Sequence, residues 1–201
     1  MSTPNHWSAP GTFVTTKWHQ GRRIFQIPKT PQIHLQTHFH YHDQNAYLLH
    51  EFVIMPDHLH LILTPSETTI FERAIGLIKG GSSHSIPKER ERKMEIWQRG
   101  FYDWTIRGES DWRTKVQYIR MNPVRVELFE KSEDWPYSSP RNDFVLDPMP
   151  PKYSQLSSGA EAPLLPAHAP GIKRRPLKEE QQPGSDGIAL QLRAQNEGAS
   201  E

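Results

Sequence analysis

The chain of 201 residues contains no cysteine. Disulfide bonds and zinc sites with thiolate ligands are therefore excluded. The absence of cysteine agrees with a reducing compartment, and we expect a cytoplasmic protein.

Long apolar runs are also missing from the sequence. No stretch approaches the ~18 uninterrupted apolar residues of a transmembrane helix, and no apolar run follows a basic segment near the first residue. We therefore expect neither a membrane span nor a signal peptide.

Charge of one sign is not in excess. Lys and Arg number 24, Asp and Glu number 23, and the formal net charge is +1. Such a balance gives no bulk attraction to nucleic acid, so a polyanionic partner would have to bind a local basic face.

Composition changes near residue 145. Eight of the 18 prolines follow Asp147, together with a Ser-Ser-Gly-Ala run, and the apolar residues there show no periodicity. Segments of this kind bury too little apolar surface to offset the entropy cost of folding. We therefore predict one folded domain over residues 10–146 and a largely disordered tail over residues 147–201.

Four stretches of the predicted domain are patterned as β-strands. They are rich in β-branched, aromatic and aliphatic residues and cover residues 12–18, 46–55, 58–63 and 101–106. The second and third are separated only by Pro56-Asp57, which is typical of a tight turn.

Two further segments show helical spacing of apolar residues. The first covers residues 70–78 and is expected to end at Gly80-Gly81, and the second begins at Glu109 and ends before Pro123. Residues 31–43 are ambiguous. Their apolar and polar residues alternate as in a strand, whereas a β–α–β–β–α–β order of elements requires a helix there.

A pair of histidines stands out in the segment Phe52–Leu63, which reads FVIMPDHLHLIL. Successive side chains of a strand point to opposite faces, so His58 and His60 share one face while Leu59 and Leu61 share the other. The leucines can pack in a core while the two imidazoles, a few ångströms apart, face outward. This spacing suits one metal ion bound by both rings.

Less specific interpretations of the pair stay open. Two histidines can decorate a half-exposed sheet face, or they can belong to a structural zinc site that needs two more ligands. The run His38-Phe-His40-Tyr-His42 is richer in imidazole, but it has no apolar strand to hold it.

A second constellation lies on the predicted helix that begins at Glu109. Tyr118 and Asn122 are four residues apart and therefore lie on one helix face. The phenol can act as a covalent nucleophile and the amide oxygen as a third metal ligand. Alternatively, Tyr118 is a core tyrosine and Asn122 caps the helix before Pro123.

Several motifs occur together in a fixed order. They are VIMPDHLHLIL (53–63), Ile-Lys-Gly (78–80), WQRGFYDWTIR (97–107), YIRMNPVR (118–125) and DWPYSS (134–139). With these motifs the chain resembles the single-tyrosine HUH transposases and, within them, the REP-associated tyrosine transposases.

The resemblance implies an α+β fold. Its core is a ferredoxin-like β–α–β–β–α–β unit with an antiparallel sheet, followed by a C-terminal helix and here by the disordered tail. It also implies a protein associated with the nucleoid of a prokaryote, and it leaves open whether the chain is a monomer or a homodimer.

The resemblance further implies that His58 and His60 bind Mg²⁺ or Mn²⁺ and that Asn122 completes the metal site. Tyr118 would attack a phosphodiester of single-stranded or hairpin DNA and leave a 5′-phosphotyrosine and a free 3′-hydroxyl. Lys115, three residues before Tyr118, either favours the phenolate or is an ordinary solvated lysine.

Basic residues of the same motifs and of the first turn are candidate phosphate contacts. They are Arg22, Arg23, Lys79, Arg99, Arg107, Arg120 and Arg125. Three other functions stay open: a metal-dependent nuclease that uses water, a non-catalytic regulator that binds hairpin DNA, and a zinc-stabilised interaction protein.

Overall fold

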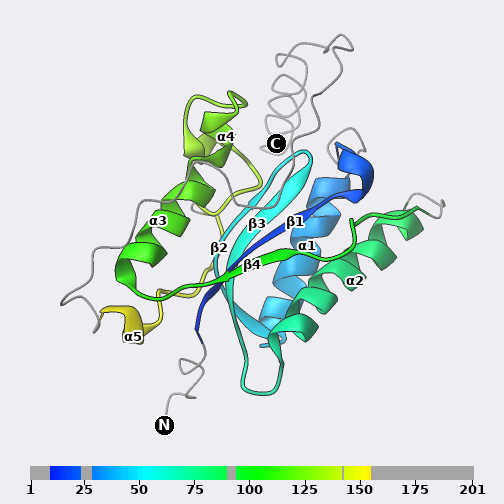
Figure 1. The fold of residues 1–201 in the computed structure, drawn as a ribbon. Coiled ribbons are helices and arrows are strands. Elements are labelled where there is room, and N and C mark those ends of the chain that lie inside the picture. Colours follow the sequence, from blue (N-terminus) through cyan, green and yellow to red (C-terminus); the bar gives the residue numbers. More distant parts are fainter. Residues whose placement is uncertain (1–9, 24–28, 90–93, 142, 155–201) are drawn as a thin grey trace.

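A computed structural model of the chain describes residues 10–23, 29–89, 94–141 and 143–154 (Figure 1). The strands are β1 (Thr12–Lys17), β2 (Tyr47–Ile54), β3 (His58–Pro65) and β4 (Tyr102–Thr105). The helices are α1 (Thr30–Asp43), α2 (Phe71–Glu89), α3 (Glu109–Arg120), α4 (Asn122–Arg125) and α5 (Pro151–Ser154), with short 3₁₀ turns η1 (His19–Gly21) and η3 (Ser132–Asp134).

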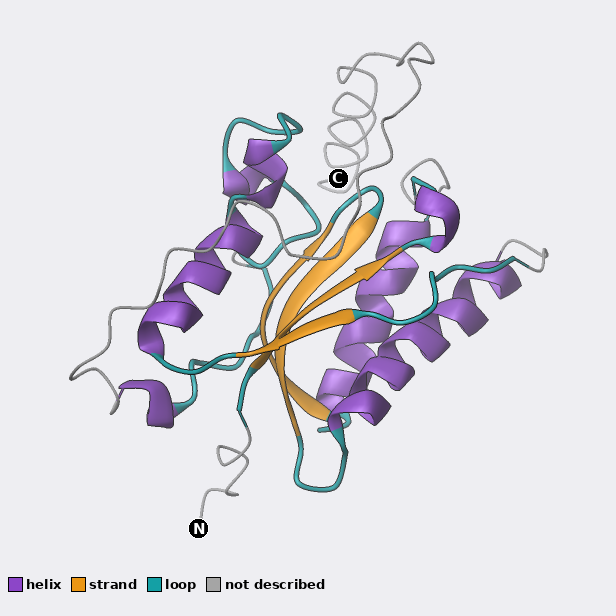
Figure 2. Ribbon diagram, in the orientation of Figure 1, coloured by secondary structure: helices purple, strands orange, loops and turns teal. Residues whose placement is uncertain are grey.

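The four strands form one sheet in the order β2-β3-β1-β4, and every neighbouring pair is antiparallel. Helices α1 and α2 cover one face of the sheet, and α3 lies on the other (Figures 1 and 2). This arrangement confirms the predicted ferredoxin-like core, with α3 as the helix that follows the last strand.

The alternating segment before β2 is a helix, α1. Pro31 occupies its first turn, where a missing N–H costs nothing. His34 and His38, one turn apart, are fully buried and pack on Trp18 and Phe52, with ring centroids 5.0 Å and 6.4 Å away respectively. The helix interpretation is therefore correct, because tertiary packing selects the four-residue spacing over the alternation.

Helix α2 does not end at Gly80-Gly81, so that prediction was wrong. It continues to Glu89. A Cβ atom on Gly81 would lie 2.7 Å from Cγ2 of Thr37 and 2.8 Å from Cε2 of Tyr41, both on α1. The glycine therefore allows two helices to approach closely, and it does not end one.

The hydrophobic core fills both sides of the sheet, and one part of it lies between the sheet and the two helices α1 and α2. Leu59, Leu61 and Leu63 of β3 are fully buried, as is Val14 of the neighbouring strand β1. Burial of each of these side chains contributes roughly 1.5–3 kcal/mol. The leucines thus fix β3 with its other face, which carries the histidine pair, toward α3.

The C-terminal segment runs along the outer edge of β2. The backbone N–H groups of Ile54, Ser139 and Asp147 donate to the carbonyl oxygens of Tyr137, Phe52 and Leu49. Bonded in this way, the segment covers the edge of the sheet, which would otherwise be free to pair with another chain.

The packed chain extends beyond residue 146. In α5 the buried hydroxyl of Tyr153 accepts a hydrogen bond from the backbone of Gly11 at 2.8 Å and donates one to the carbonyl of Ile106 at 3.0 Å. Residues 147–154, which composition assigns to the tail, therefore pack on the domain, and residues 155–201 lie outside the described residues. None of the helices that the structure describes is long and apolar enough to cross a membrane.

Candidate active site

The two histidines of β3 lie side by side on the sheet face that α3 covers. His58 is paired with Lys17 and His60 with Thr15 in the register with β1. The centroids of the two imidazole rings are 4.5 Å apart. The two histidines therefore share one face of the sheet, as predicted.

Each imidazole is oriented through its Nδ1 atom. Nδ1 of His58 donates to the carboxylate of Asp57 at 2.6 Å, and Nδ1 of His60 is hydrogen-bonded to the hydroxyl of Thr15 at 2.8 Å. Histidines that bind metals are commonly held in this way by a second group. Sequence reasoning missed both partners; Asp57 is adjacent to His58 and was detectable, whereas Thr15 is found only from the strand register.

The Nε2 atom of His60 is buried and has no hydrogen-bond partner among the residues that the structure describes. His60 is only 4% exposed, and burial, reinforced by the nearby His58, lowers the pKa of its imidazole well below 6.5. The ring is therefore neutral at physiological pH, which is the form that binds metals. An unsatisfied, neutral nitrogen of this kind fits a metal ligand.

The carboxylate of Asp57 stays charged. Its burial raises the pKa, but the hydrogen bond from His58 outweighs burial, so the pKa lies below its usual value. A charged acceptor holds Nδ1–H of His58 firmly and makes the opposite nitrogen a better ligand.

Tyr118 is brought to the pair by α3. Its ring centroid lies 5.1 Å from that of His60 and 5.9 Å from that of Phe13, which itself stacks on His60 at 5.4 Å. Tyr118 is partly exposed. The predicted nucleophile and the predicted metal ligand thus share one small aromatic cluster.

Asn122 follows Tyr118 by four residues, just beyond the end of α3. A Cβ atom on Gly11 would touch both Trp112 and Ile62, so α3 begins beside Ile62, and it reaches His60 at Tyr118. Asn122, one turn further, is buried and opens α4. The alternative of a helix cap is wrong, because Met121 takes the C-cap position of α3.

Two of the predicted DNA contacts each make at least two hydrogen bonds to other groups of the protein. The ammonium of Lys79 donates to the carbonyl oxygens of Gln98 and Gly100 at 3.0 and 2.7 Å. The guanidinium of Arg120 forms a two-pronged contact with the carboxylate of Glu51. Both side chains therefore hold elements together.

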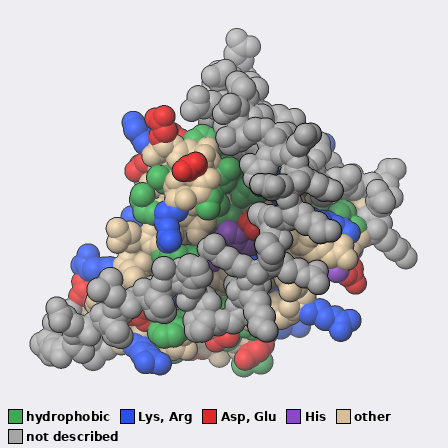
Figure 3. Space-filling view, turned by 45° about the horizontal axis from the view of Figure 1, so that its top comes forward, with side chains coloured by type: hydrophobic (Ala, Val, Ile, Leu, Met, Phe, Trp, Pro, Cys, Tyr) green, Lys and Arg blue, Asp and Glu red, His purple; other side chains and the backbone are tan. Residues whose placement is uncertain are grey.

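The other predicted contacts are exposed. The guanidinium of Arg125 lies 5.4 Å from the ring centroid of Tyr118, that of Arg107 lies 5.3 Å from Trp104, and Arg22 donates to the backbone of Glu95. On the face shown in Figure 3, Lys and Arg are scattered among Asp and Glu rather than gathered in one patch. Arg125 alone of the seven contacts Tyr118 through an interaction found in the described chain.

Lys115 is not an ordinary solvated lysine, which was one of its two interpretations. It is 5% exposed, and its ammonium lies 4.9 Å from the ring centroid of Phe13 and 4.7 Å from that of Trp104. Burial lowers the pKa of this lysine, although Asp111 opposes the shift. Lys115 therefore packs against the aromatic cluster.

The rival histidines belong to α1, whose packing places them on the other side of the sheet. His38 is bonded to His34 at 2.9 Å, and His42 to Asp147 at 2.8 Å, while His40 is exposed. Across the described ranges, no three His, Cys, Asp or Glu side chains gather closely enough to hold a metal ion. Any ion at His58 and His60 would therefore need additional oxygen ligands from elsewhere, such as Asn122, phosphate or water.

A ferredoxin-like sheet whose paired histidines face one tyrosine on the following helix has the architecture expected of a single-tyrosine HUH transposase. Residues 18–122 match the family model described as "Transposase IS200 like". The chain therefore belongs to the IS200-like transposase family, and the resemblance found in the sequence is confirmed.

Two curated relatives of this chain are named as REP-associated tyrosine transposases. A REP-associated tyrosine transposase of Escherichia coli K12 is 31% identical over 96 residues, and a candidate one of Haemophilus influenzae is 34% identical over 100 residues. The matches cover 47% and 45% of this chain but only 55% and 57% of those proteins. The chain thus matches little more than half the length of these curated relatives.

A solved structure shows the same fold. It is a REP-associated tyrosine transposase bound to a REP hairpin, with 26% identity and a TM-score of 0.58. The similarity covers 67% of this chain and 79% of that chain.

Proposed function

We propose that the chain is a metal-dependent transposase that cuts and rejoins single-stranded DNA beside a hairpin. The approach of Tyr118 to His60 carries this proposal, together with the unsatisfied Nε2 atom of that histidine. A core tyrosine packed on a core histidine explains the ring contact, but it leaves a buried nitrogen without a partner, which is costly. A metal ligand beside a nucleophile explains both features.

In the proposed reaction the phenolic oxygen of Tyr118 attacks a DNA phosphorus. A bond forms between these two atoms, the bond from phosphorus to the 3′ oxygen breaks, and that oxygen gains a proton as the phenol loses one. The products are a 5′-phosphotyrosine and a free 3′-hydroxyl. Because the linkage is still a phosphodiester, a 3′-hydroxyl can later attack it and rejoin strands without ATP.

The proposed metal site consists of the Nε2 atoms of His58 and His60 and the amide oxygen of Asn122. Asp57 and Thr15 keep the two imidazoles in the orientation that a ligand needs. When bound, Mg²⁺ or Mn²⁺ would polarise the phosphate and stabilise the charge that develops on it. Since Mg²⁺ prefers oxygen to imidazole, phosphate and water oxygens would supply the remaining ligands, and we expect weak binding without DNA.

The proposed substrate is a DNA hairpin with an unpaired flank, in line with the related transposase solved with a REP hairpin. Arg125 lies over the ring of Tyr118 and can reach a phosphate next to the attacking oxygen. Arg22, Arg23, Arg99 and Arg107 are exposed and are proposed as outer contacts. Lys79 and Arg120 are left out, because each makes at least two hydrogen bonds within the protein, whereas Arg22 makes one among the described residues.

The test uses a pool of hairpin oligonucleotides with randomised flanks, labelled at the 3′ end and incubated with Mn²⁺ or Mg²⁺. The labelled strand should become covalently attached to the protein on a denaturing gel, and Tyr118→Phe should abolish this adduct. Tyr102→Phe is the matched control, because it removes a phenol from β4 at the position paired with Thr15. This control should form the adduct at the wild-type rate.

Two outcomes would contradict the proposal and support another function. Cleavage without an adduct, unchanged in Tyr118→Phe, would indicate a nuclease that uses water. Tight hairpin binding in EDTA, with no cleavage in any metal, would indicate a non-catalytic regulator.

A further inference from the structure

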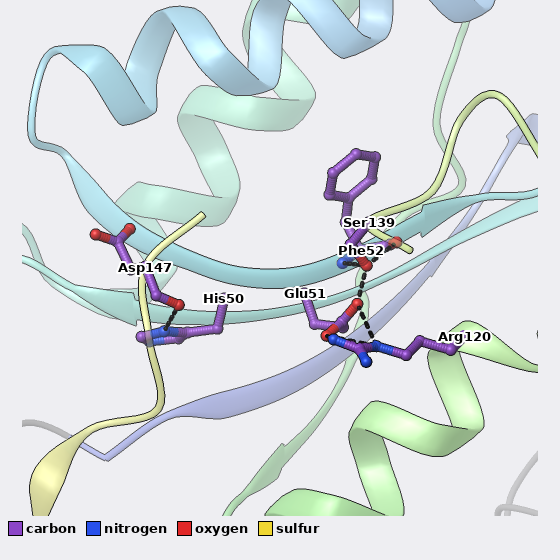
Figure 4. Close-up of polar contacts among 6 residues, drawn as sticks. All are labelled: His50, Glu51, Phe52, Arg120, Ser139 and Asp147. Atoms are coloured by element: carbon purple, nitrogen blue, oxygen red, sulfur yellow. Dashed lines mark hydrogen bonds and ion pairs between the residues drawn. The ribbon is translucent and has the colours of Figure 1, made fainter. Parts of the chain in front are cut away.

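A charged cluster joins the nucleophile-bearing helix to the sheet. Glu51 of β2 is only 2% exposed, and its carboxylate receives Nε of Arg120 at 3.2 Å and a terminal nitrogen of the same guanidinium at 2.9 Å (Figure 4). The side chain of Arg120 is 51% exposed. Burial therefore holds the carboxylate of Glu51 in place, and Arg120 reaches it from α3.

A third residue binds the same carboxylate. The hydroxyl of Ser139 donates to Glu51, and its backbone N–H donates to the carbonyl oxygen of Phe52 at 3.0 Å (Figure 4). The cluster therefore connects β2, α3 and the C-terminal segment. Burial raises the pKa of Glu51, and the bond to Arg120 opposes this shift.

The cluster lies on the same sheet face as the histidine pair. Glu51 is paired with Ile62 and Val53 with His60, so Glu51 and His60 point toward α3 from neighbouring positions. Arg120 follows Tyr118 by two residues on that helix, an axial rise of about 3 Å. A contact so close to Tyr118 sets both the distance of α3 from the sheet and the rotation of α3 about its axis at the nucleophile.

We propose that the Glu51–Arg120 pair positions Tyr118 against the histidine pair. This inference depends on the proposed role of Tyr118 as the nucleophile. A guanidinium that binds a carboxylate with two nitrogens fixes direction as well as distance, whereas the ammonium of a lysine fixes distance only. Displacing a reacting atom by about 1 Å can cost about 100-fold in rate.

The competing assignment is that Arg120 binds a DNA phosphate, as its motif suggested. The two assignments predict different kinetic losses. A phosphate contact contributes to binding, so its loss raises the half-saturating DNA concentration and reduces the salt slope by about 1. Loss of a positioning pair leaves the affinity for DNA unchanged and slows the attack of Tyr118 on bound DNA.

The first experiment measures single-turnover adduct formation at saturating DNA. Arg120→Gln and Glu51→Gln should each slow the reaction by about 10- to 100-fold, with half-saturation within about twofold of wild type. The double variant should be no slower than the slower single variant, because the two residues act as one unit. Arg120→Lys keeps the charge and should recover only part of the rate.

The matched control is Arg113→Gln. It breaks the exposed ion pair between Arg113 and Glu109 on the same helix, away from Tyr118. This control should keep the wild-type rate, and thermal unfolding of every variant reports whether it is folded. A rate loss in Arg120→Gln that comes entirely from weaker DNA binding would overturn the proposal.

A second readout does not require catalysis. With 3-fluorotyrosine at residue 118, the ¹⁹F signal senses the neighbouring ring of His60. Arg120→Gln and Glu51→Gln should shift or broaden it, and Arg113→Gln should not. An unchanged signal in the first two variants would refute the positioning role, whereas absence of any adduct in the wild type would instead refute the proposed function.

Discussion

The ring of Tyr118 lies 5.1 Å from that of His60, although the two residues come from separate elements, α3 and β3. The sheet places them there because Leu59 and Leu61 bury the opposite face of the strand. His60, whose Nε2 atom has no hydrogen-bond partner among the described residues, is thereby held on the sheet face that Tyr118 approaches. The predictions below follow from this geometry.

Loss of one histidine of the pair should weaken metal binding. His58→Ala should weaken Mn²⁺ binding at least ~10-fold, measured by electron paramagnetic resonance on the hairpin complex in a Tyr118→Phe background. His40→Ala, which changes an exposed ring on α1, should bind Mn²⁺ as wild type does. Equal losses in both variants would argue against a site at β3.

The carboxylate beside the pair should matter for metal affinity without contacting the metal. Asp57→Asn keeps the shape of the side chain but replaces the charged acceptor for Nδ1–H of His58. We expect Mn²⁺ affinity to fall by roughly 10- to 100-fold, as for other groups that orient a ligand. Isothermal titration of the hairpin complex with Mn²⁺ measures this loss, and wild-type affinity would show that Asp57 has no such role.

Local patterns predicted the sheet well. The four strands lie within two residues of their predicted bounds, because alternation and turn residues are local signals. The shared face of His58 and His60 has the same origin.

Interactions between distant residues were not predictable in this way. Arg120 is 69 positions from Glu51, and nothing in its own motif reveals that it binds a buried carboxylate rather than DNA. Lys115 likewise packs on Phe13, and α1 follows its contacts with Trp18 and Phe52 rather than its alternating pattern. In each case the deciding contact comes from another element of the fold.

The two neighbouring glycines of α2 should respond oppositely to alanine. Gly81→Ala places a methyl group against Thr37 and Tyr41 and should destabilise the fold by roughly 1–3 kcal/mol. Gly80→Ala meets nothing within 4 Å and should stabilise it by roughly 0.5–1 kcal/mol, because alanine favours a helix. Urea unfolding measures the change in the free energy of unfolding for both variants. Changes of the same sign would contradict the close contact between α1 and α2.

Stability should fall in acid because of the buried histidines of α1. Burial lowers the pKa of His38 to about 3, and burial together with His38 lowers that of His34. The unfolded chain therefore binds more protons below about pH 6.5, the ordinary pKa of histidine. The contribution of these neutral histidines to the free energy of unfolding is fully present above that pH and is lost as the pH falls from 6.5 toward 3. At about 1.4 kcal/mol per pKa unit, the loss amounts to several kcal/mol.

Urea unfolding between pH 8 and 5 measures this dependence. His38→Gln should flatten the slope of unfolding free energy against pH, whatever its effect on stability at pH 8. A slope as steep as that of the wild type would show that His38 is not a source of the acid sensitivity.

The most direct test of the catalytic centre is to identify the residue joined to DNA. Trypsin cuts after Lys115 and Arg120, so Tyr118 lies in the peptide Val116–Arg120, whereas Tyr102 lies in Gly100–Arg107. Mass spectrometry of the nuclease-trimmed adduct should find the nucleotide on the first peptide, attached to Tyr118 through a 5′-phosphate. A nucleotide on the second peptide, or on any residue other than Tyr118, would contradict the assignment of the nucleophile and with it the role of the histidine pair beside it.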